Sequence, residues 1–408
     1  MAAELVNEMT SQAVLRPPQL GGYSEELARA EADIAKLELR LQRYPRDLEL
    51  RVRLLYRLFH RASLTCAMAS FEALEAATLE AIHEFGPKED LCLLKANLDL
   101  RFHRLAEARS DLERSPLLPG RLEGRVLLAD LDFQEGRYEA ARLGLEELIK
   151  ESPTWDNLAR LAHWKSKLGD ADEAYRLYEE AEDDLTAKQM RSYAWLELQC
   201  GVLALQHGRY AEAGFHYRRA EEAYPGHWQT DEHFAELLAA EGRFDEAEAL
   251  FKKVIARAPK PELQQALGEL CLFAGRTDEA QPWLDRALAA YLESVRGGGV
   301  HYFHHLADFY ADAREEPAEA VRWARKDVAT RSNFSTQAAM AWALYRNGEL
   351  AEAVEYIRLA LSSGVQDSGI FSTASTVFEA AGKSAEGQSY AQAALRINPG
   401  HGNFHMHH

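Results

Sequence analysis

The sequence predicts an all-α protein built as a solenoid of stacked helical hairpins, and three observations support this fold class. From Glu25 onward, apolar residues recur three and four positions apart in segments rich in Ala, Leu, Glu and Arg, as in amphipathic helices. Strand-like alternation of apolar and polar residues is missing from these segments. A short motif around a glycine returns at intervals of about 34 residues, and such a fixed period is typical of helical repeats.

The chain divides into four segments by composition and periodicity. The first 22 residues contain two prolines and two glycines without sustained periodicity, so we expect residues 1–22 to form a flexible leader. Residues 23–87 are expected to form degenerate helical pairs, one over Glu25–Tyr44 and one over Leu48–Phe85. The repeat solenoid is expected over residues 88–399, and a His-rich tail follows at residues 400–408.

The repeated motif marks the turn between the two helices of each hairpin. Glycine can end a helix in the left-handed conformation at little steric cost, which lets the chain reverse into a second helix. The turn glycines are Gly136, Gly169, Gly208, Gly242, Gly275, Gly348 and Gly382.

Small residues on both sides of each turn allow the two helix axes to approach closely. Five residues after the glycines stand Ala141, Ala174, Ala213, Ala247, Ala280, Ala353 and Gly387. Seven residues before the glycines stand Ala129, Ala162, Gly201, Ala235, Gly268, Ala341 and Ser375. Prolines after four of the second helices are expected to stop them, at Pro153, Pro225, Pro259 and Pro399.

Two further copies lack the turn glycine. An early copy has His103 in the glycine place, and a late copy fits if Arg314 occupies the turn and one residue is inserted before Ala320. The two longest intervals, Gly169 to Gly208 and Gly275 to Arg314, also lack the stopping proline. We therefore expect longer second helices or larger loops in those two intervals.

This pattern resembles the tetratricopeptide repeat (TPR) family in its period, small residues, turn glycine and closing proline. The resemblance covers about Lys88 to Pro399, with nine copies. It implies a right-handed α-solenoid of about nine TPR-like helical hairpins, preceded by the degenerate N-terminal helices. It also implies a concave wall, built mainly from first helices, that usually grips a peptide or protein segment.

In this register, the side chains thirteen, ten and six residues before each turn lie on one helical face and line the groove. The resulting row is acidic, with histidines at one end, and clustered carboxylates attract a segment that carries Lys or Arg. The same carboxylates could instead solvate an exposed surface, and Trp195 and Leu198 could either anchor a partner or pack against a neighbouring helix. The expected groove residues are Glu123, Asp130, Asp156, His163, Trp195, Leu198, Gln229, Glu232, Glu236, Glu262, Gln265, Glu269, His301, His304 and Asp308.

The histidines offer an alternative reading as a metal site. His301, His304 and Asp308 project two imidazoles and a carboxylate from one helix face, which are ligands that transition metals accept. The tail histidines His405, His407 and His408 are further candidates. Groove contacts or packing are the competing explanation, and we expect no cofactor.

Composition excludes several function classes. The chain has 47 Lys plus Arg against 65 Asp plus Glu, a formal charge of -18, so its average surface repels nucleic acid. No apolar run is long enough to span a bilayer and no secretory signal is visible, so we expect a cytoplasmic protein. Four isolated cysteines form no CxxC pair, and no phosphate-binding loop, HExxH helix or nucleophile elbow occurs.

The sequence therefore predicts a non-catalytic adaptor or scaffold that binds a basic or amphipathic segment of a partner protein in an acidic concave groove. A metal-binding or metal-handling protein is one alternative, and an enzyme with an unrecognised site is another.

Overall fold

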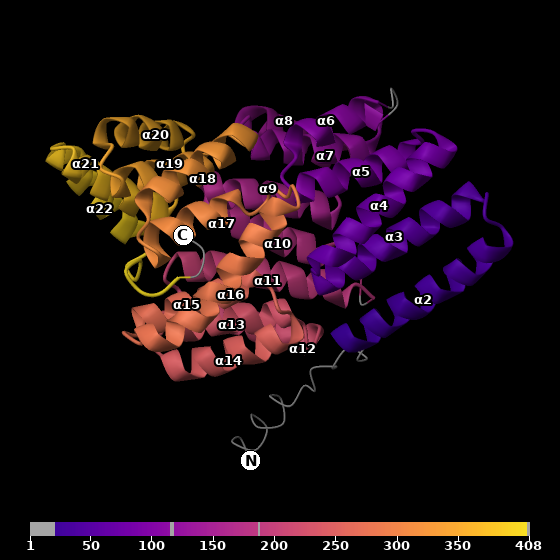
Figure 1. Cartoon of the computed structure of the whole chain (residues 1–408), viewed down its shortest axis with the longest axis horizontal. Coiled ribbons are helices and arrows are strands. Elements are labelled where there is room, and N and C mark those ends of the chain that lie inside the picture. The colour runs from indigo at the N-terminus through magenta and orange to yellow at the C-terminus, as the bar shows by residue number, and fades with distance from the viewer. Residues whose placement is uncertain (1–20, 115–117, 187, 406–408) are drawn as a thin grey trace, which may run out of the picture.

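The computed structural model describes residues 21–114, 118–186 and 188–405. Within these ranges the chain is helical and contains no strand, which confirms the predicted all-α class (Figure 1). The expected leader lies outside the described residues except for its last two glycines.

Three long helices open the described chain: α2 (Tyr23–Arg43), α3 (Leu48–Thr65) and α4 (Met68–Phe85). The helical pair expected over Leu48–Phe85 is present as α3 and α4. The pair expected over Glu25–Tyr44 is wrong, because this segment forms the single helix α2 of 21 residues. No glycine or proline interrupts its apolar pattern, so the helix continues until Tyr44.

Nine helical hairpins follow within the described residues, as the repeat count predicts. They are α5 (Glu89–Arg101) with α6 (Leu105–Glu113), α7 (Leu122–Gln134) with α8 (Tyr138–Glu151), α9 (Trp155–Leu168) with α10 (Ala171–Asp183), α11 (Met190–Gln206) with α12 (Tyr210–Ala223), α13 (Trp228–Ala240) with α14 (Phe244–Arg257), α15 (Pro261–Phe273) with α16 (Thr277–Arg296), α17 (Phe303–Asp308) and the π-helix η2 (Phe309–Ala313) with α18 (Pro317–Thr330), α19 (Phe334–Arg346) with α20 (Leu350–Ser362), and α21 (Ser368–Ala380) with α22 (Ser384–Ile397). A 3-10 turn, η1 (Leu118–Gly120), precedes α7.

The turn chemistry agrees with the expected register. All seven turn glycines have positive φ, from 69° to 124°, and His103 has φ 59° in the glycine place. The small residues after the turns are fully buried at Ala247 and Ala280. A Cβ on Gly268 would lie 2.6 Å from Leu284 Cδ2, so the close approach of α15 and α16 requires glycine.

The irregular copy differs from the expectation at one residue. The left-handed turn residue is Glu315, with φ 53°, whereas Arg314 has φ -108°. The inserted residue lies before the turn and is absorbed by the π-helix η2, which widens one helical turn by a residue. Ala320 then stands five residues after Glu315, as in the regular copies.

The two intervals without a stopping proline are longer in different ways. Helix α16 runs for 20 residues, whereas α10 has an ordinary length of 13 and a longer connection leads to α11. Helices that precede a proline end two residues before it, as α8 does before Pro153.

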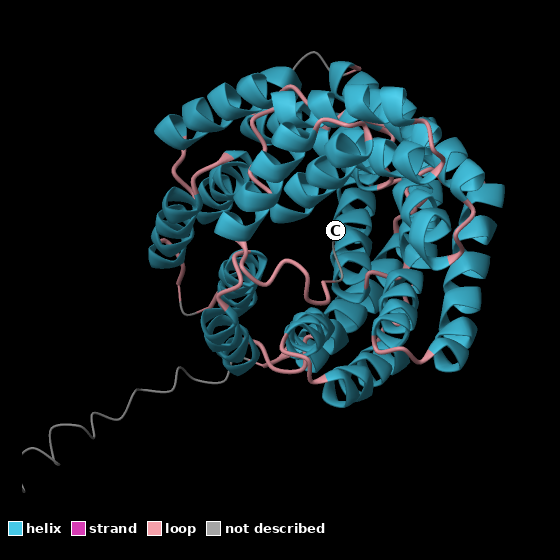
Figure 2. Cartoon of the chain, turned by 90° about the vertical axis from the view of Figure 1, so that its left-hand side faces the viewer, coloured by secondary structure: helices cyan, strands magenta, loops and turns pink. Residues whose placement is uncertain are grey.

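The solenoid winds so tightly that its second superhelical turn rests on its first. We call residues 21–223 the first coil and residues 224–405 the second coil. Tyr224 Oη donates a hydrogen bond to Glu26 Oε2 (2.6 Å), and Asn333 Nδ2 donates one to Gln134 O (3.0 Å), across 198 and 199 residues of sequence. Figure 2 shows the helices encircling the centre of the view, with the C-terminal segment crossing the interior.

Three turn glycines of the first coil lie against the second coil. A Cβ on Gly208 would lie 2.6 Å from Asn398 Oδ1, and a Cβ on Gly136 would collide with Ser332 O. Gly169 faces Gln366, whose backbone N–H donates to Lys167 O (3.0 Å). These glycines therefore serve both the hairpin turn and the contact between coils.

Candidate functional site

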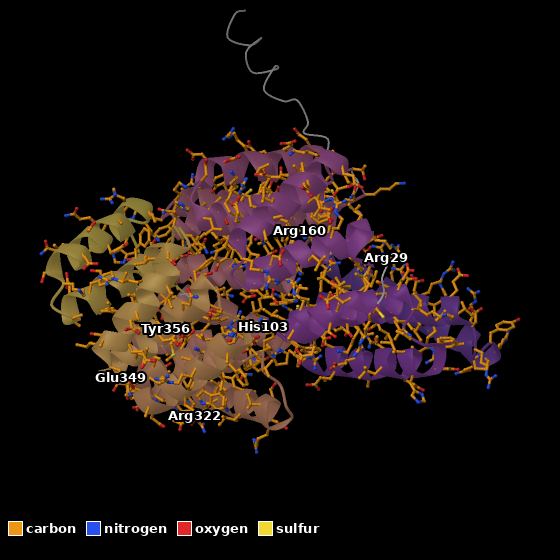
Figure 3. All side chains as sticks on the ribbon, turned by 90° about the horizontal axis from the view of Figure 1, so that it is seen from above. Arg29, His103, Arg160, Arg322, Glu349 and Tyr356 are labelled. Carbon is orange, nitrogen blue, oxygen red and sulfur yellow. The ribbon has the colours of Figure 1, made fainter. Side chains whose placement is uncertain are left out.

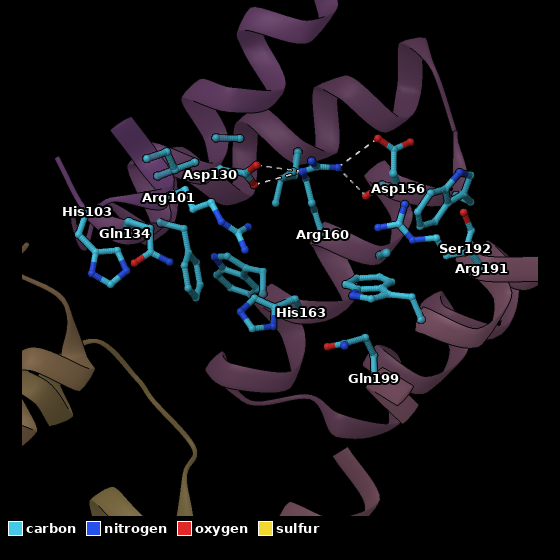
Figure 4. Close-up of a pocket in the computed structure, with 18 residues that line it drawn as sticks. Arg101, His103, Asp130, Gln134, Asp156, Arg160, His163, Arg191, Ser192 and Gln199 are labelled. Carbon is cyan, nitrogen blue, oxygen red and sulfur yellow. Dashed lines mark hydrogen bonds and ion pairs between the residues drawn. The ribbon is translucent and has the colours of Figure 1, made fainter. Parts of the chain in front are cut away.

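A cavity of about 780 Å³ opens on the inner side of the first coil (Figure 4). Side chains from α5, α7, α9 and α11, the first helices of four successive hairpins, line it. Four of the expected groove residues contribute to this lining, namely Asp130, Asp156, His163 and Trp195. The structure therefore brings together the part of the row that comes from α7, α9 and α11.

Aromatic side chains form much of this cavity wall. The rings of Trp155 and Trp195 meet edge to face, with centroids 6.1 Å apart, and the Phe133 ring lies 5.4 Å from His163. Trp164 Nε1 donates a hydrogen bond to Tyr138 O (3.0 Å), which fixes that indole. Trp195 remains 38% exposed, so part of its ring is available to a partner.

Arginines balance the acidic groups of the cavity. Arg160 lies between Asp130 and Asp156 and contacts a carboxylate oxygen of each at 3.1 Å (Figure 4). Desolvation raises the pKa of Asp130, and the ion pair with Arg160 opposes that shift. Arg101 and Arg191 also line the cavity, so three arginines face two aspartates. This section of the wall is therefore not acidic, in contrast to the sequence-based expectation.

The sequence register missed these arginines and two of the tryptophans. Only three positions of each first helix entered the expected row, whereas a concave wall also uses the flanking positions of the same face. Arg160 stands four residues after Asp156, and this spacing is the signal that could have revealed the ion pair. Figure 3 places Arg160 and His103 toward the middle of the molecule.

The middle of the expected row is buried rather than open. Glu232, Glu236 and Gln265 expose only 8%, 4% and 7% of their surface. Trp228 Nε1 donates to Leu64 O (3.1 Å), which ties this part of the second coil to the α3–α4 corner of the first coil. These three residues are inaccessible to a partner in this structure, which corrects the groove assignment made for them.

The next hairpin shows the same enclosure. Gln265 Oε1 accepts a hydrogen bond from Tyr291 Oη (2.8 Å), and Gln265 Nε2 donates to Glu269 Oε1 (2.7 Å). Desolvation raises the pKa of Glu269 to about 7, although the Gln265 hydrogen bond favours the charged form. Glu262 is half-buried, and Lys260 Nζ lies 3.7 Å from its carboxylate.

The histidine end of the row forms part of the contact between coils. His103 of the first coil packs against His301 and His304 of the second, with ring centroids 6.1 Å and 5.7 Å away. Desolvation, together with nearby carboxylates, holds the pKa of Asp308 well above its usual range. These three row residues are half-buried and face the protein interior.

The described residues give no support to the metal site that was the alternative reading for this end. Among the described residues, no group of three or more His, Cys, Asp and Glu side chains is arranged to hold a metal ion. His301 and His304 pack against His103 instead, and His405 joins no such cluster. His407 and His408 lie outside the described residues.

The remaining row residues divide between surface and core. Glu123 is exposed and lies 3.5 Å from the Arg121 guanidinium, and Gln229 is half-buried. Leu198 is buried in the apolar cluster around Ala213 and Tyr217, so it packs within its hairpin.

All four cysteines are free, and three of them are buried. No helix in the described part of the chain is long and apolar enough to cross a bilayer.

Comparisons with known proteins identify the repeat. A tetratricopeptide repeat family model matches residues 204–270, and a second model with the same description matches residues 263–286 and 335–357. Comparison with curated proteins gives no sequence match.

Several solved structures are similar to this chain. One is the APC/C hetero-tetramer Cut9-Hcn1, with 15% identity over 92% of this chain and 85% of that chain and a TM-score of 0.43. Another is the human IFIT1 dimer with PPP-AAAA, with 14% identity over 90% and 94% of the two chains and a TM-score of 0.44. A third is Pseudomonas aeruginosa PilF, with 21% identity over 52% and 94% and a TM-score of 0.32.

Proposed function

Because this chain is a tetratricopeptide-repeat protein, we propose that it is a non-catalytic adaptor that holds an amphipathic segment of a partner protein on the inner side of its first coil. Tetratricopeptide repeats build scaffolds for protein interaction, and the cavity lined by α5, α7, α9 and α11 is the site proposed for the partner. Four free cysteines support a reducing compartment, and we propose the cytoplasm.

The observation that carries this proposal is the combination of aromatic and arginine side chains around one cavity. Trp and Arg dominate the binding energy of protein interfaces, because they offer large contact areas and directed hydrogen bonds. Trp155, Trp164 and Trp195 supply such a surface, and Arg101 and Arg191 stand at its edges. A cavity of about 780 Å³ is large enough for an apolar side chain and its flanking backbone.

The charge of the cavity favours an amphipathic segment over a purely basic one. The chain carries a net charge of -18, and exposed carboxylates such as Glu123 on α7 would attract Lys or Arg outside the cavity. The cavity itself contains more arginines than aspartates, so it would repel a second cation. A partner with an apolar anchor and mixed flanking charges satisfies both conditions.

The test is the affinity of peptides selected from a random library against the full chain. We expect Trp195→Ala to weaken the binding of these peptides by about tenfold or more, because loss of an interface tryptophan costs roughly 2 kcal/mol. Titration calorimetry measures the change in dissociation constant. Phe215→Ala is the matched control, because Phe215 on α12 is 50% exposed but does not line the cavity.

Two outcomes would contradict the proposal. One is unchanged affinity in the Trp195→Ala variant, and the other is an equal loss in the Phe215→Ala variant. The thermal unfolding midpoints of both variants must match that of the unmodified chain, so that a change in affinity reports on the site.

A further inference from the structure

The segment after the last repeat folds back into the solenoid instead of leaving it. Helix α22 ends at Ile397, and the following residues form two consecutive backbone turns. His401 N–H donates to Asn398 O (3.1 Å), and Asn403 N–H donates to Gly400 O (2.9 Å). Figure 2 shows this segment inside the ring of helices. From here on, the tail means residues 398–405, the described residues that follow α22.

The tail sits on the turn between α11 and α12 of the first coil. Asn403 Nδ2 donates a hydrogen bond to Tyr210 Oη (2.9 Å), and Tyr210 Oη in turn points to Gly400 O (3.5 Å). A Cβ on Gly400 would collide with Tyr210 Oη, so a larger residue at position 400 would have to displace the end of this side chain. Asn398 is buried against Gly208 in the same place.

An aromatic anchor fixes the other end of the tail. Phe404 exposes only 5% of its surface and belongs to the large apolar core of the second coil. Its ring lies 5.8 Å from the ring of Phe273, the last residue of α15, and Phe273 lies 5.8 Å from Phe244 at the start of α14. Phe273 remains 52% exposed even with the tail in place. Burial of a phenylalanine side chain contributes roughly 1.5 to 3 kcal/mol, so Phe404 holds the tail in its seat.

From this geometry we infer a peptide-binding site inside the solenoid, distinct from the tryptophan-lined cavity, which takes a segment with glycine four residues before phenylalanine. The seat comprises Tyr210 and Phe273, and the tail of this chain occupies it. Phe244 supports the seat from behind by its ring contact with Phe273. Glycine at the first position leaves room for the Tyr210 phenol, and the ring of Phe273 contacts the aromatic side chain at the second. The tail contributes no helix to the repeat array, so its departure removes none of the nine hairpins.

The occupant and the seat belong to different parts of the chain, so a second molecule can compete for the seat. A segment of another protein with the same Gly-x-x-x-Phe pattern would displace the tail once it exceeds the effective concentration of the tethered copy. That concentration is of the order of millimolar for a short tether, so the tail sets a threshold for the external ligand.

The experiment uses a fluorescent peptide of residues 398–408 and the full-length chain. In the Phe404→Ala variant the tail loses its anchor, and we expect the peptide to bind this variant at least about tenfold more tightly than it binds the unmodified chain. A peptide with alanine in place of the phenylalanine should not bind. The doubly substituted Phe404→Ala, Phe273→Ala chain should lose the peptide, whereas Phe404→Ala, Phe215→Ala should keep it.

Two measurements keep the result interpretable. Circular dichroism must show that each variant retains the helical content of the unmodified chain, and chelator in the buffer prevents metal-mediated binding of the histidines. Hydrogen exchange at residues 208–212 should slow when the peptide binds to Phe404→Ala. Equal binding to the two chains, or absence of binding to folded Phe404→Ala, would overturn the inference.

Discussion

At the scale of single residues, turn glycines with the same backbone conformation differ in what surrounds them. Gly136 and Gly242 both have φ 77° and both end the first helix of a hairpin. A Cβ on Gly242 meets nothing within 4 Å, whereas a Cβ on Gly136 would collide with the backbone oxygen of Ser332 in the second coil. The sequence motif is the same at both positions, and only the superhelical packing distinguishes them.

This difference predicts unequal effects of alanine. Gly242→Ala should cost about 1 to 2 kcal/mol, the ordinary penalty of a left-handed backbone with a side chain. Gly136→Ala should cost more, because the added methyl group also separates the coils. Urea unfolding measures the total loss, and hydrogen exchange at residues 332–336 reports the separation. Equal losses with unchanged exchange at those residues would argue against the contact between Gly136 and Ser332.

At the scale of the helical element, the hairpins follow from local patterns, and the sequence predicts them well. The small residue, the turn glycine and the closing proline each act within one hairpin, so their meaning does not depend on distant parts of the chain. The extra residue before Glu315 was visible as an irregular spacing. The sequence does not show where the extra residue is accommodated, because a π-helical turn and a longer loop would give the same spacing.

The small residue on the second helix gives a direct test of hairpin packing. Ala247 on α14 is fully buried and Ala249 on the same helix is exposed. Ala247→Leu should lower the free energy of unfolding by roughly 1 to 3 kcal/mol, because the added carbon atoms overpack the interface with α13. Ala249→Leu is the control and should change the free energy of unfolding by less than about 0.5 kcal/mol. Denaturant titration of both variants decides, and similar losses would contradict the register.

At the scale of the whole molecule, the structure departs from the sequence-based groove because the coils touch. Glu232 and Glu236 are buried, and Trp228 on the same helix donates a hydrogen bond to Leu64 O of the first coil. No local pattern encodes the contact between coils, because its hydrogen bonds join residues up to almost 200 positions apart. The cavity around Trp195 and its neighbours is an open part of the first coil.

The contact between coils also predicts a response to acid. Desolvation first, and then the nearby Arg331 and neighbouring imidazoles, hold the pKa values of His103 and His304 well below 6.5, and His301 has a pKa of about 4. Below pH 6.5 a separated coil therefore binds more protons than a docked one, so the docking free energy decreases as the pH falls from 6.5 toward 4. The pKa of Asp308 is raised instead, so this carboxyl group favours docking as the pH falls. A variant that lacks one of the histidines therefore separates their effect from that of Asp308.

His103→Asn provides that comparison, because asparagine tolerates the left-handed backbone at this turn. We expect the radius of gyration of the unmodified chain, measured by small-angle X-ray scattering, to increase between pH 7 and pH 5. The increase should be smaller in His103→Asn. The exposed residue His83 supplies the control substitution His83→Asn, which should behave like the unmodified chain. An identical increase in all three proteins would rule out the histidine contact as its cause.

The layered arrangement also restricts how many repeats this architecture can gain or lose. In an open solenoid, duplication of one hairpin extends the array and leaves every other contact in place. Here, a hairpin duplicated between Gly208 and Ser332 would lengthen the chain between the partners of all three contacts, which are Gly136 with Ser332, Gly169 with Gln366 and Gly208 with Asn398. The partners would then no longer lie opposite each other. The number of hairpins per revolution is thus fixed by vertical neighbours, and the array changes length safely only at its two ends.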